Sequence, residues 1–234
     1  MPKKRSALLT AAILTGLFWN SPGLTESSVL MNMEKAGESI VRIRVVGQGM
    51  VQENGLKLVR YSSFAAGILI HSSGLIVTNA HTIRGAGDTV HVHLSDGRTL
   101  SGKVLGIFPG EDLGFVQAVT AEPLPALALA DSTRVGLGTA VYTIGTSEIR
   151  DRSFSQGKIT AIGQERNPGG KTPVKVFRVN FSAYQGDSGS PILDREGRLL
   201  GILSARQNDR TRSSFAVPSA VIAGRLAELN SGQR

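Results

Sequence analysis

The stretch AYQGDSGSPILD, residues 183–194, places Ser188 between two glycines and directly after an acid. A serine hydroxyl becomes a nucleophile when an imidazole removes its proton and a carboxylate orients that imidazole. Glycines let the backbone turn sharply at such a serine, and backbone N–H groups can then face a developing oxyanion. We therefore take Ser188 as a candidate nucleophile and the amides of Gly186, Asp187 and Ser188 as a candidate oxyanion hole.

Four histidines compete for the role of the general base. His81 follows the apolar run GLIVTNA, so it is expected just past the end of a strand, where a side chain can face a cleft. His71 falls in a hairpin turn and is expected in solvent. His91 and His93 share one face of a strand, and a metal pair is the alternative there, although no third ligand lies near in the sequence. We take His81 as the candidate base.

Asp112 is the preferred acid, because it directly precedes the apolar strand LGFVQAV. Glu111 is its local competitor. The acids Asp88, Asp96 and Asp131 lie in turns or in a linker, where short polar side chains have ordinary backbone-bonding roles. The chain order is therefore His81, Asp112, Ser188.

These residues need a scaffold, and the rest of the pattern indicates an all-β one. Short runs of alternating or continuous apolar residues, separated by Gly, Asp and Ser turns, fill residues 39–119 with about six strands and residues 139–217 with six more. A short helix is expected at 29–38, and a C-terminal helix from Pro218, which fits a first-turn position. The expected organisation is a leader 1–25, a first β half 26–122, a linker 123–138 and a second β half with the helix 139–234.

Composition excludes several alternatives. The 234 residues contain no cysteine, which excludes a disulfide framework, a thiol nucleophile and thiolate metal sites. The net charge is +8, but the basic residues are scattered. Arg206, Arg210 and Arg212 cluster loosely without interleaved aromatic residues, which favours a solvated loop over a nucleic-acid site.

The N-terminal residues have the architecture of a signal peptide. Three basic residues at 3–5 precede an uncharged apolar run at 7–19, which is short for a membrane span. We therefore expect an exported protein, periplasmic or secreted. No A-x-A cleavage pattern is evident, so an uncleaved membrane anchor formed by residues 7–19 is the alternative.

The order of the three candidate residues is that of the chymotrypsin-type triad, and the chain resembles the HtrA (DegP-like) serine proteases. The resemblance rests on AAGILIHSSGLIVTNAHTI, LSDGRTLSGKVLGIFPGEDLGFVQAV, LALADSTRVGLGTAVYTIG, SQGKITAIG and FAVPSAVI, with similar spacing from about Val29 to Leu229. It implies two six-stranded antiparallel β-barrels, with His81 and Asp112 on one side of the cleft and Ser188 on the other.

The resemblance also implies an activity. It points to a serine endopeptidase that works through an acyl-enzyme, needs no metal or organic cofactor, and acts on polypeptides in extracytoplasmic protein quality control. It further implies a homotrimer in which residues 29–37 pack between subunits. A catalytically silent or partner-activated binding module of the same fold is the alternative function.

The sequence departs from the family around the serine. The family usually has Asn before it and Gly two residues after it, whereas this chain has Asp187 and Ser190. In chymotrypsin relatives such an acid pairs with a freed N-terminal amine, but a cut after Arg44 would break a good strand. Asp187 is therefore expected to bond local amides or a basic residue. The chain also ends at Arg234 without a PDZ domain, so regulation through one is not implied.

By the same resemblance, three segments form the walls of the specificity pocket. They contain no acid, which favours a small or medium apolar side chain before the cut, while Arg206 would favour an acidic one. The residues are Ser182, Ala183, Tyr184, Gln185, Ser204, Ala205, Arg206, Ser214 and Phe215.

Overall fold

A computed structural model of the chain describes residues 25–52, 56–83, 89–145, 154–165, 174–181, 186–206 and 213–232. The expected leader, apart from Thr25, and the pocket segment 182–185 lie outside these ranges. No helix in the described ranges is both long enough and apolar enough to cross a membrane.

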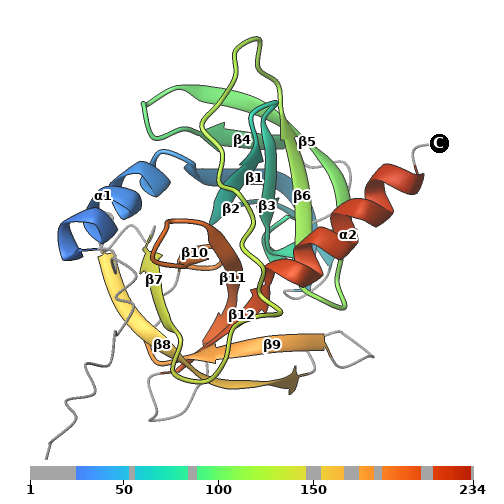
Figure 1. The fold of residues 1–234 in the computed structure, drawn as a ribbon. Coiled ribbons are helices and arrows are strands. Elements are labelled where there is room, and N and C mark those ends of the chain that lie inside the picture. The colour runs from blue at the N-terminus through green and yellow to red at the C-terminus, as the bar shows by residue number, and fades with distance from the viewer. Residues whose placement is uncertain are drawn as a thin grey trace, which may run out of the picture.

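The first half of the chain forms a closed six-stranded antiparallel barrel (Figure 1). Its core is made by alternating residues such as Val41, Ile43 and Val45, which point inward and are 0–1 % exposed. The strands are joined in the order β1-β2-β3-β6-β5-β4. They are β1 (Ile40–Gln52), β2 (Leu56–His71), β3 (Leu75–Thr78), β4 (Thr89–His93), β5 (Thr99–Phe108) and β6 (Leu113–Ala118).

The second half repeats this architecture, with the strands joined in the order β10-β11-β12-β9-β8-β7. The predicted fold class, two six-stranded barrels with a C-terminal helix, is confirmed. The strands are β7 (Ala140–Ile144), β8 (Phe154–Glu165), β9 (Val174–Val179), β10 (Pro191–Leu193), β11 (Leu199–Arg206) and β12 (Ser214–Pro218).

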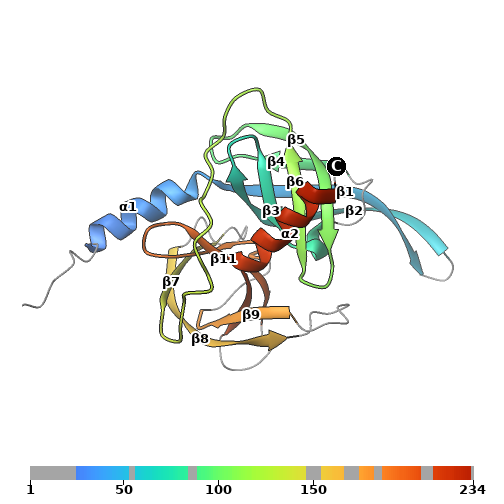
Figure 2. The same ribbon diagram turned by 45° about the vertical axis from the view of Figure 1, so that its right-hand side comes forward.

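Several element boundaries differ from the sequence-based expectation. Pro218 ends strand β12, and the C-terminal helix α2 (Ser219–Gly232) begins one residue later. The strand expected from residue 39 continues as β1 to Gln52, where it pairs with β2 in a long hairpin that projects from the barrel (Figure 2). The expected strands did not include its outer part, although Asn54 and Gly55 form a pair that is typical of hairpin turns.

The N-terminal helix α1 (Glu26–Gly37) begins three residues before the expected start, because Thr25 caps it by accepting a hydrogen bond from the Ser28 amide. Its buried side, with Val29, Met33 and Ala36, packs into the chain's own core. Leu30 and Met31 on its other side are 51 % and 68 % exposed. The subunit contact expected for this segment stays a prediction.

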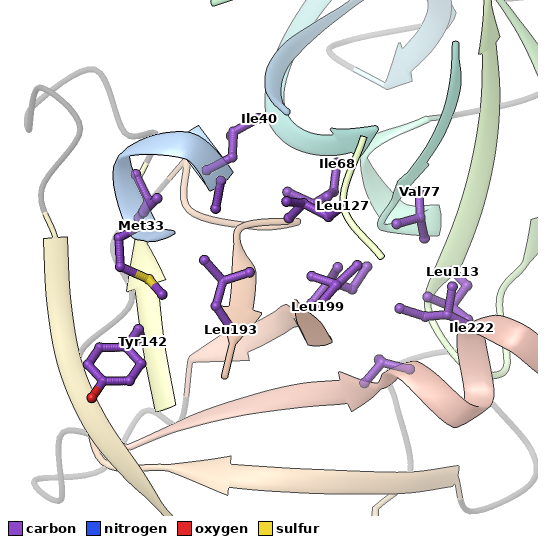
Figure 3. Packing of buried hydrophobic residues seen from close by; sticks show 14 of the residues in the cluster. Met33, Ile40, Ile68, Val77, Leu113, Leu127, Tyr142, Leu193, Leu199 and Ile222 are labelled. Carbon is purple, nitrogen blue, oxygen red and sulfur yellow. The ribbon is translucent and has the colours of Figure 1, made fainter. Parts of the chain in front are cut away.

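An apolar cluster lies between the barrels and holds them together (Figure 3). Ile68 and Leu113 come from the first barrel, Leu193 and Leu199 from the second, and Ile222 from α2. The linker between β6 and β7 contributes Leu127 and is hydrogen-bonded to both barrels, through its amide to the Leu69 carbonyl and through Ala130 to the Leu199 carbonyl. The two barrels are thus held in one packed unit.

Candidate active site

His81 lies on a single 3-10 turn, Ala80–Thr82, directly after strand β3. The Thr82 hydroxyl donates to the Asn79 carbonyl at 2.7 Å and closes this turn. The His81 amide donates to Asp112 Oδ1 at 3.0 Å, so the backbone as well as the ring is fixed to the acid. The His81 side chain is 49 % exposed and can meet a ligand from solvent.

Asp112 occupies the last position before β6 in an unusual backbone conformation. Its φ of +56° is the only positive value among the non-glycine residues that the structure describes. Aspartate tolerates this left-handed region better than most residues, and such conformations gather at functional sites. Here it turns the carboxylate toward His81, while Asn79 Nδ2 donates to the Asp112 carbonyl at 3.2 Å.

The Asp112 carboxylate holds the His81 ring in one orientation. His81 Nδ1 lies 2.9 Å from both carboxylate oxygens, and the Ser204 hydroxyl donates to Oδ2 at 2.6 Å. The acid is only 8 % exposed, so these contacts are little screened by water. A ring that donates from Nδ1 has a lone pair on Nε2, which points at Ser188.

Ser188 Oγ lies 3.2 Å from His81 Nε2, within reach for proton transfer. The serine is placed by a loop in which Gly186 and Gly189 have φ values of +95° and +83°. The Ser188 carbonyl accepts from the Ala66 amide at 2.9 Å, and the Gly189 amide donates to Leu203. The Ser188 loop is therefore tied to both barrels.

The amides expected to form the oxyanion hole lie on this same loop. In the described ranges no backbone carbonyl accepts a hydrogen bond from the Ser188 amide. Asp187 is 6 % exposed, so its carboxylate lies within the protein rather than in solvent. Its carbonyl accepts from the Ser190 amide at 2.9 Å, which closes the turn behind the serine. The oxyanion-hole assignment stays a prediction.

Glu111, the competitor of Asp112, has a different partner. Its Oε1 accepts from Arg225 Nη2 of helix α2, and the Arg225 guanidinium lies 5.2 Å from the centre of the Phe108 ring. The structure thus separates the two neighbouring acids. Asp112 faces the histidine, and Glu111 anchors the same loop to the C-terminal helix.

Two serines assigned to the pocket walls have other contacts. Ser204 directs its hydroxyl to Asp112, and Ser214 is fully buried with its hydroxyl donating to the Phe181 carbonyl at 2.9 Å. The sequence marks Ser204 only as a polar residue that ends the apolar run LLGIL, and that signal does not reveal the partner.

The remaining described pocket candidates lie on adjacent strands. Ala205 and Arg206 of β11 pair with Phe215 and Ser214 of β12. The ring of Phe215 is half-buried, and the guanidinium of Arg178 lies 5.2 Å from its centre. The structure thus brings one side of the expected pocket together, while Ser182, Ala183, Tyr184 and Gln185 lie outside the described residues.

The other histidines have hydrogen-bond partners outside the triad. His71 ends β2, and its Nδ1 is 2.9 Å from the Ser73 hydroxyl. His91 and His93 lie on β4, and His93 Nδ1 is 2.9 Å from Thr99 Oγ1. The described part of the chain contains no group of three or more acidic or histidine side chains able to hold a metal.

This geometry contains the parts of nucleophilic acyl transfer: a hydroxyl, a base within proton-transfer distance, and a buried acid that orients the base. Residues 65–202, which include all three, match the family of trypsin-like peptidase domains. The chain is 33 % identical over 161 residues to a Synechocystis protein named as the serine protease HhoB, covering 68 % of this chain and 38 % of that protein. It is 31 % identical over 173 residues to a Marinomonas protein named as a DegP-like periplasmic serine endoprotease, covering 73 % and 36 %.

Among solved structures, the HtrA-type protease AlgW with a decapeptide superimposes with a TM-score of 0.79 at 19 % identity, over 88 % of this chain and 68 % of that one. This likeness shows the fold. The chain spans 36–41 % of the length of three curated relatives that it matches.

Proposed function

Because the chain belongs to the trypsin-like peptidase family, we propose that it is a serine endopeptidase in which Ser188 is the nucleophile, His81 the general base and Asp112 the orienting acid. The observation that carries this proposal is the continuous set of contacts from Asp112 through His81 to Ser188, at 2.9 and 3.2 Å. A binding module has no need of three such groups in this order and geometry.

The proposed reaction has two halves. Ser188 Oγ attacks the carbonyl carbon of the scissile peptide while His81 Nε2 takes the hydroxyl proton. Amides of the 186–188 loop stabilise the tetrahedral oxyanion. When the C–N bond breaks, His81 gives the proton to the leaving amine and an ester remains on Ser188. Water then attacks the ester as His81 again takes a proton, which releases the carboxylic acid and restores the hydroxyl.

Asp112 stabilises the protonated imidazole that exists between these transfers. Its carboxylate also keeps the Nδ1–H tautomer, so that Nε2 always faces the serine. The Ser204 hydroxyl and the His81 amide satisfy the carboxylate oxygens while it stays ionised. These residues therefore suffice for the proton movements of both halves.

For the substrate and compartment, the support comes from relatives and from the N-terminal pattern. Relatives are named as periplasmic endoproteases, and a structural neighbour was solved with a peptide. Residues 3–19 have a basic and then apolar pattern typical of export. We infer polypeptide substrates and an exported location, with extracytoplasmic quality control as the role.

The test is cleavage of a peptide library and of an unfolded protein, with sequencing of the products. Ser188→Ala and His81→Ala should each lower the cleavage rate by about a thousandfold or more. Ser72→Ala, which changes an exposed serine in the turn after β2, is the matched control and should cleave like the wild type. Equal cleavage by Ser188→Ala and wild type would refute the proposal.

A further inference from the structure

Four nitrogen-bearing side chains form a square on the outer face of the first barrel. Arg42 on β1 is directly opposite His93 on β4, and Arg44 is directly opposite His91. Directly opposite residues of an antiparallel pair point to the same face, as do residues two apart along a strand. The alternate residues Ile43, Val90 and Val92 are 0–1 % exposed and point into the barrel. The four therefore share the outer face.

This face continues directly to the nucleophile. On the other side of β1, strand β2 places Ala66 opposite Arg42 and Phe64 opposite Arg44. The Ala66 amide donates to the Ser188 carbonyl at 2.9 Å, so the row that starts at the nucleophile loop runs through Ala66 and Arg42. The next pair toward α1, Ile68 and Ile40, is buried between the barrels.

Phe64 is the apolar part of this face. Its ring is 43 % exposed, and the Arg44 guanidinium lies 5.7 Å from its centre. Arg44 Nε also donates to the Ser62 hydroxyl at 3.1 Å, which holds the guanidinium above the ring. An aromatic ring with a fixed cation above it offers both an apolar surface and a charge to a chain lying across it.

The four side chains Arg42, Arg44, His91 and His93 are all basic. Arginine is always protonated in a protein. The pKa of His93 is held below its usual value by its burial and by the nearby His91, Arg42 and Arg44. The charged neighbours that act on His93 are thus all basic groups.

We propose that this face, the β1–β4 basic platform of Arg42, Arg44, His91 and His93 together with Phe64, binds acidic residues of the polypeptide substrate on the first-barrel side of the scissile bond. The inference rests on the proposed function and adds a substrate class to it. It assigns a role in specificity to residues that lie outside the triad and outside the pocket on the second barrel.

The spacing supports an extended acidic segment. Residues two apart on a strand, such as Arg42 and Arg44, are separated by about 7 Å, twice the rise per residue. Alternate side chains of an extended peptide have the same spacing, so two acidic residues with one residue between them can each reach one arginine. A guanidinium binds a carboxylate through two parallel N–H donors, which gives geometric selectivity as well as charge.

The main test compares two fluorogenic peptides with one cleavage site. One has acidic residues at alternate positions on both sides of the cut, and the other has glutamine there. In R42Q/R44Q, kcat/KM for the acidic peptide should fall at least tenfold more than for the glutamine peptide, mainly through KM. R42K/R44K, which keeps the two charges but loses the paired N–H donors, should keep only part of the preference, and high salt should weaken it in the wild type.

Lys158→Gln with Lys175→Gln is the matched control, because it removes two charges from exposed positions on β8 and β9 of the other barrel. This control should keep the preference for the acidic peptide. Equal losses for both peptides in R42Q/R44Q, or an equal loss of preference in the lysine control, would overturn the platform.

A binding measurement separates this inference from the proposed function. Fluorescence anisotropy of the labelled acidic peptide with Ser188→Ala needs no catalysis. The affinity should exceed that for the glutamine peptide, and adding R42Q/R44Q should remove the difference. If the wild-type protein shows no cleavage and the two peptides still differ in affinity, the platform stands and the catalytic proposal fails. If cleavage occurs but the affinities are equal, the platform fails alone.

Discussion

The two sides of the catalytic cleft are held in place in different ways. On the first barrel, Asp112 receives the ring and the backbone amide of His81, so base and acid are fixed within one barrel. On the second barrel, the carbonyl of Ser188 is tied to Ala66 across the interface, and Gly189 packs against the same residue. The base–acid pair is therefore a local property, whereas the base–nucleophile distance depends on how the barrels pack.

A second hydrogen bond links the two sides, and its donor lies on the second barrel. Ser204, on β11 of the second barrel, donates to the carboxylate of Asp112 on the first barrel. The interface thus carries a hydrogen bond to each side of the site, one to the nucleophile loop and one to the acid. Disturbing either contact should lower activity without removing any residue of the triad.

Of the changes that leave the triad intact, the largest effect is expected at Gly189, which has a φ of +83° and faces the Ala66 carbonyl. A Cβ at this position would lie 2.1 Å from that backbone oxygen, so Gly189→Ala must displace the nucleophile loop from the first barrel. Because a shift of about 1 Å can cost about a hundredfold in rate, kcat/KM should fall by about that factor.

Steady-state kinetics with a peptide substrate measure this effect. Gly163→Ala is the control, because a Cβ there meets open space and its φ is not positive. It should keep wild-type activity. Wild-type kinetics in Gly189→Ala would show that the contact with Ala66 does not place the nucleophile.

A smaller effect is expected from Ser204→Ala, which removes a hydrogen bond to a charged carboxylate. Such bonds are worth about 1.5–3 kcal/mol, so kcat should fall about tenfold or more if the bond supports the ionised acid during catalysis. Ser219→Ala removes another buried hydroxyl, bonded to the Ala130 carbonyl, and is the control for lost stability alone. If both variants lose stability but neither loses kcat, Ser204 has only a structural role.

The smallest effect is a pH dependence of the protein's stability that comes from His93 on the first barrel. The folded protein lowers the pKa of His93 below its usual value of 6.5 through burial and through His91, Arg42 and Arg44. The unfolded chain then binds more protons, so His93 makes the free energy of unfolding fall as the pH drops below about 6.5. His93→Gln should reduce the loss of melting temperature between pH 7.5 and pH 5.5. If His93→Gln loses as much melting temperature as the wild type over this pH range, the folded protein does not lower the pKa of His93.

Much of this fold could be predicted because the strands are short, apolar and separated by clear turn residues. The order of His81, Asp112 and Ser188 along the chain could also be predicted, since each flanks a recognisable strand or glycine turn. The choice between Asp112 and Glu111 was less secure, because it depends on a positive φ at Asp112 and on Arg225, which is more than a hundred residues away. Neither can be read from local propensity.

The partners of Ser204 and Ser214 could not be predicted for a similar reason. Whether a hydroxyl in β11 or β12 faces a pocket, a carbonyl or a carboxylate depends on strand register and on barrel packing, and not on the residue type. The basic platform was missed because its residues come from two strands that are about fifty residues apart in the sequence. Their alignment appears only once β1 is paired with β4.

The most direct test of the central claim is labelling with a fluorophosphonate, followed by mapping of the adduct by mass spectrometry. We expect one adduct, on Ser188, formed far more slowly in His81→Ala, because the serine must lose its proton to Nε2 as it attacks. An adduct on another serine, or labelling of Ser188 at the same rate without His81, would refute the proposed roles of Ser188 and His81.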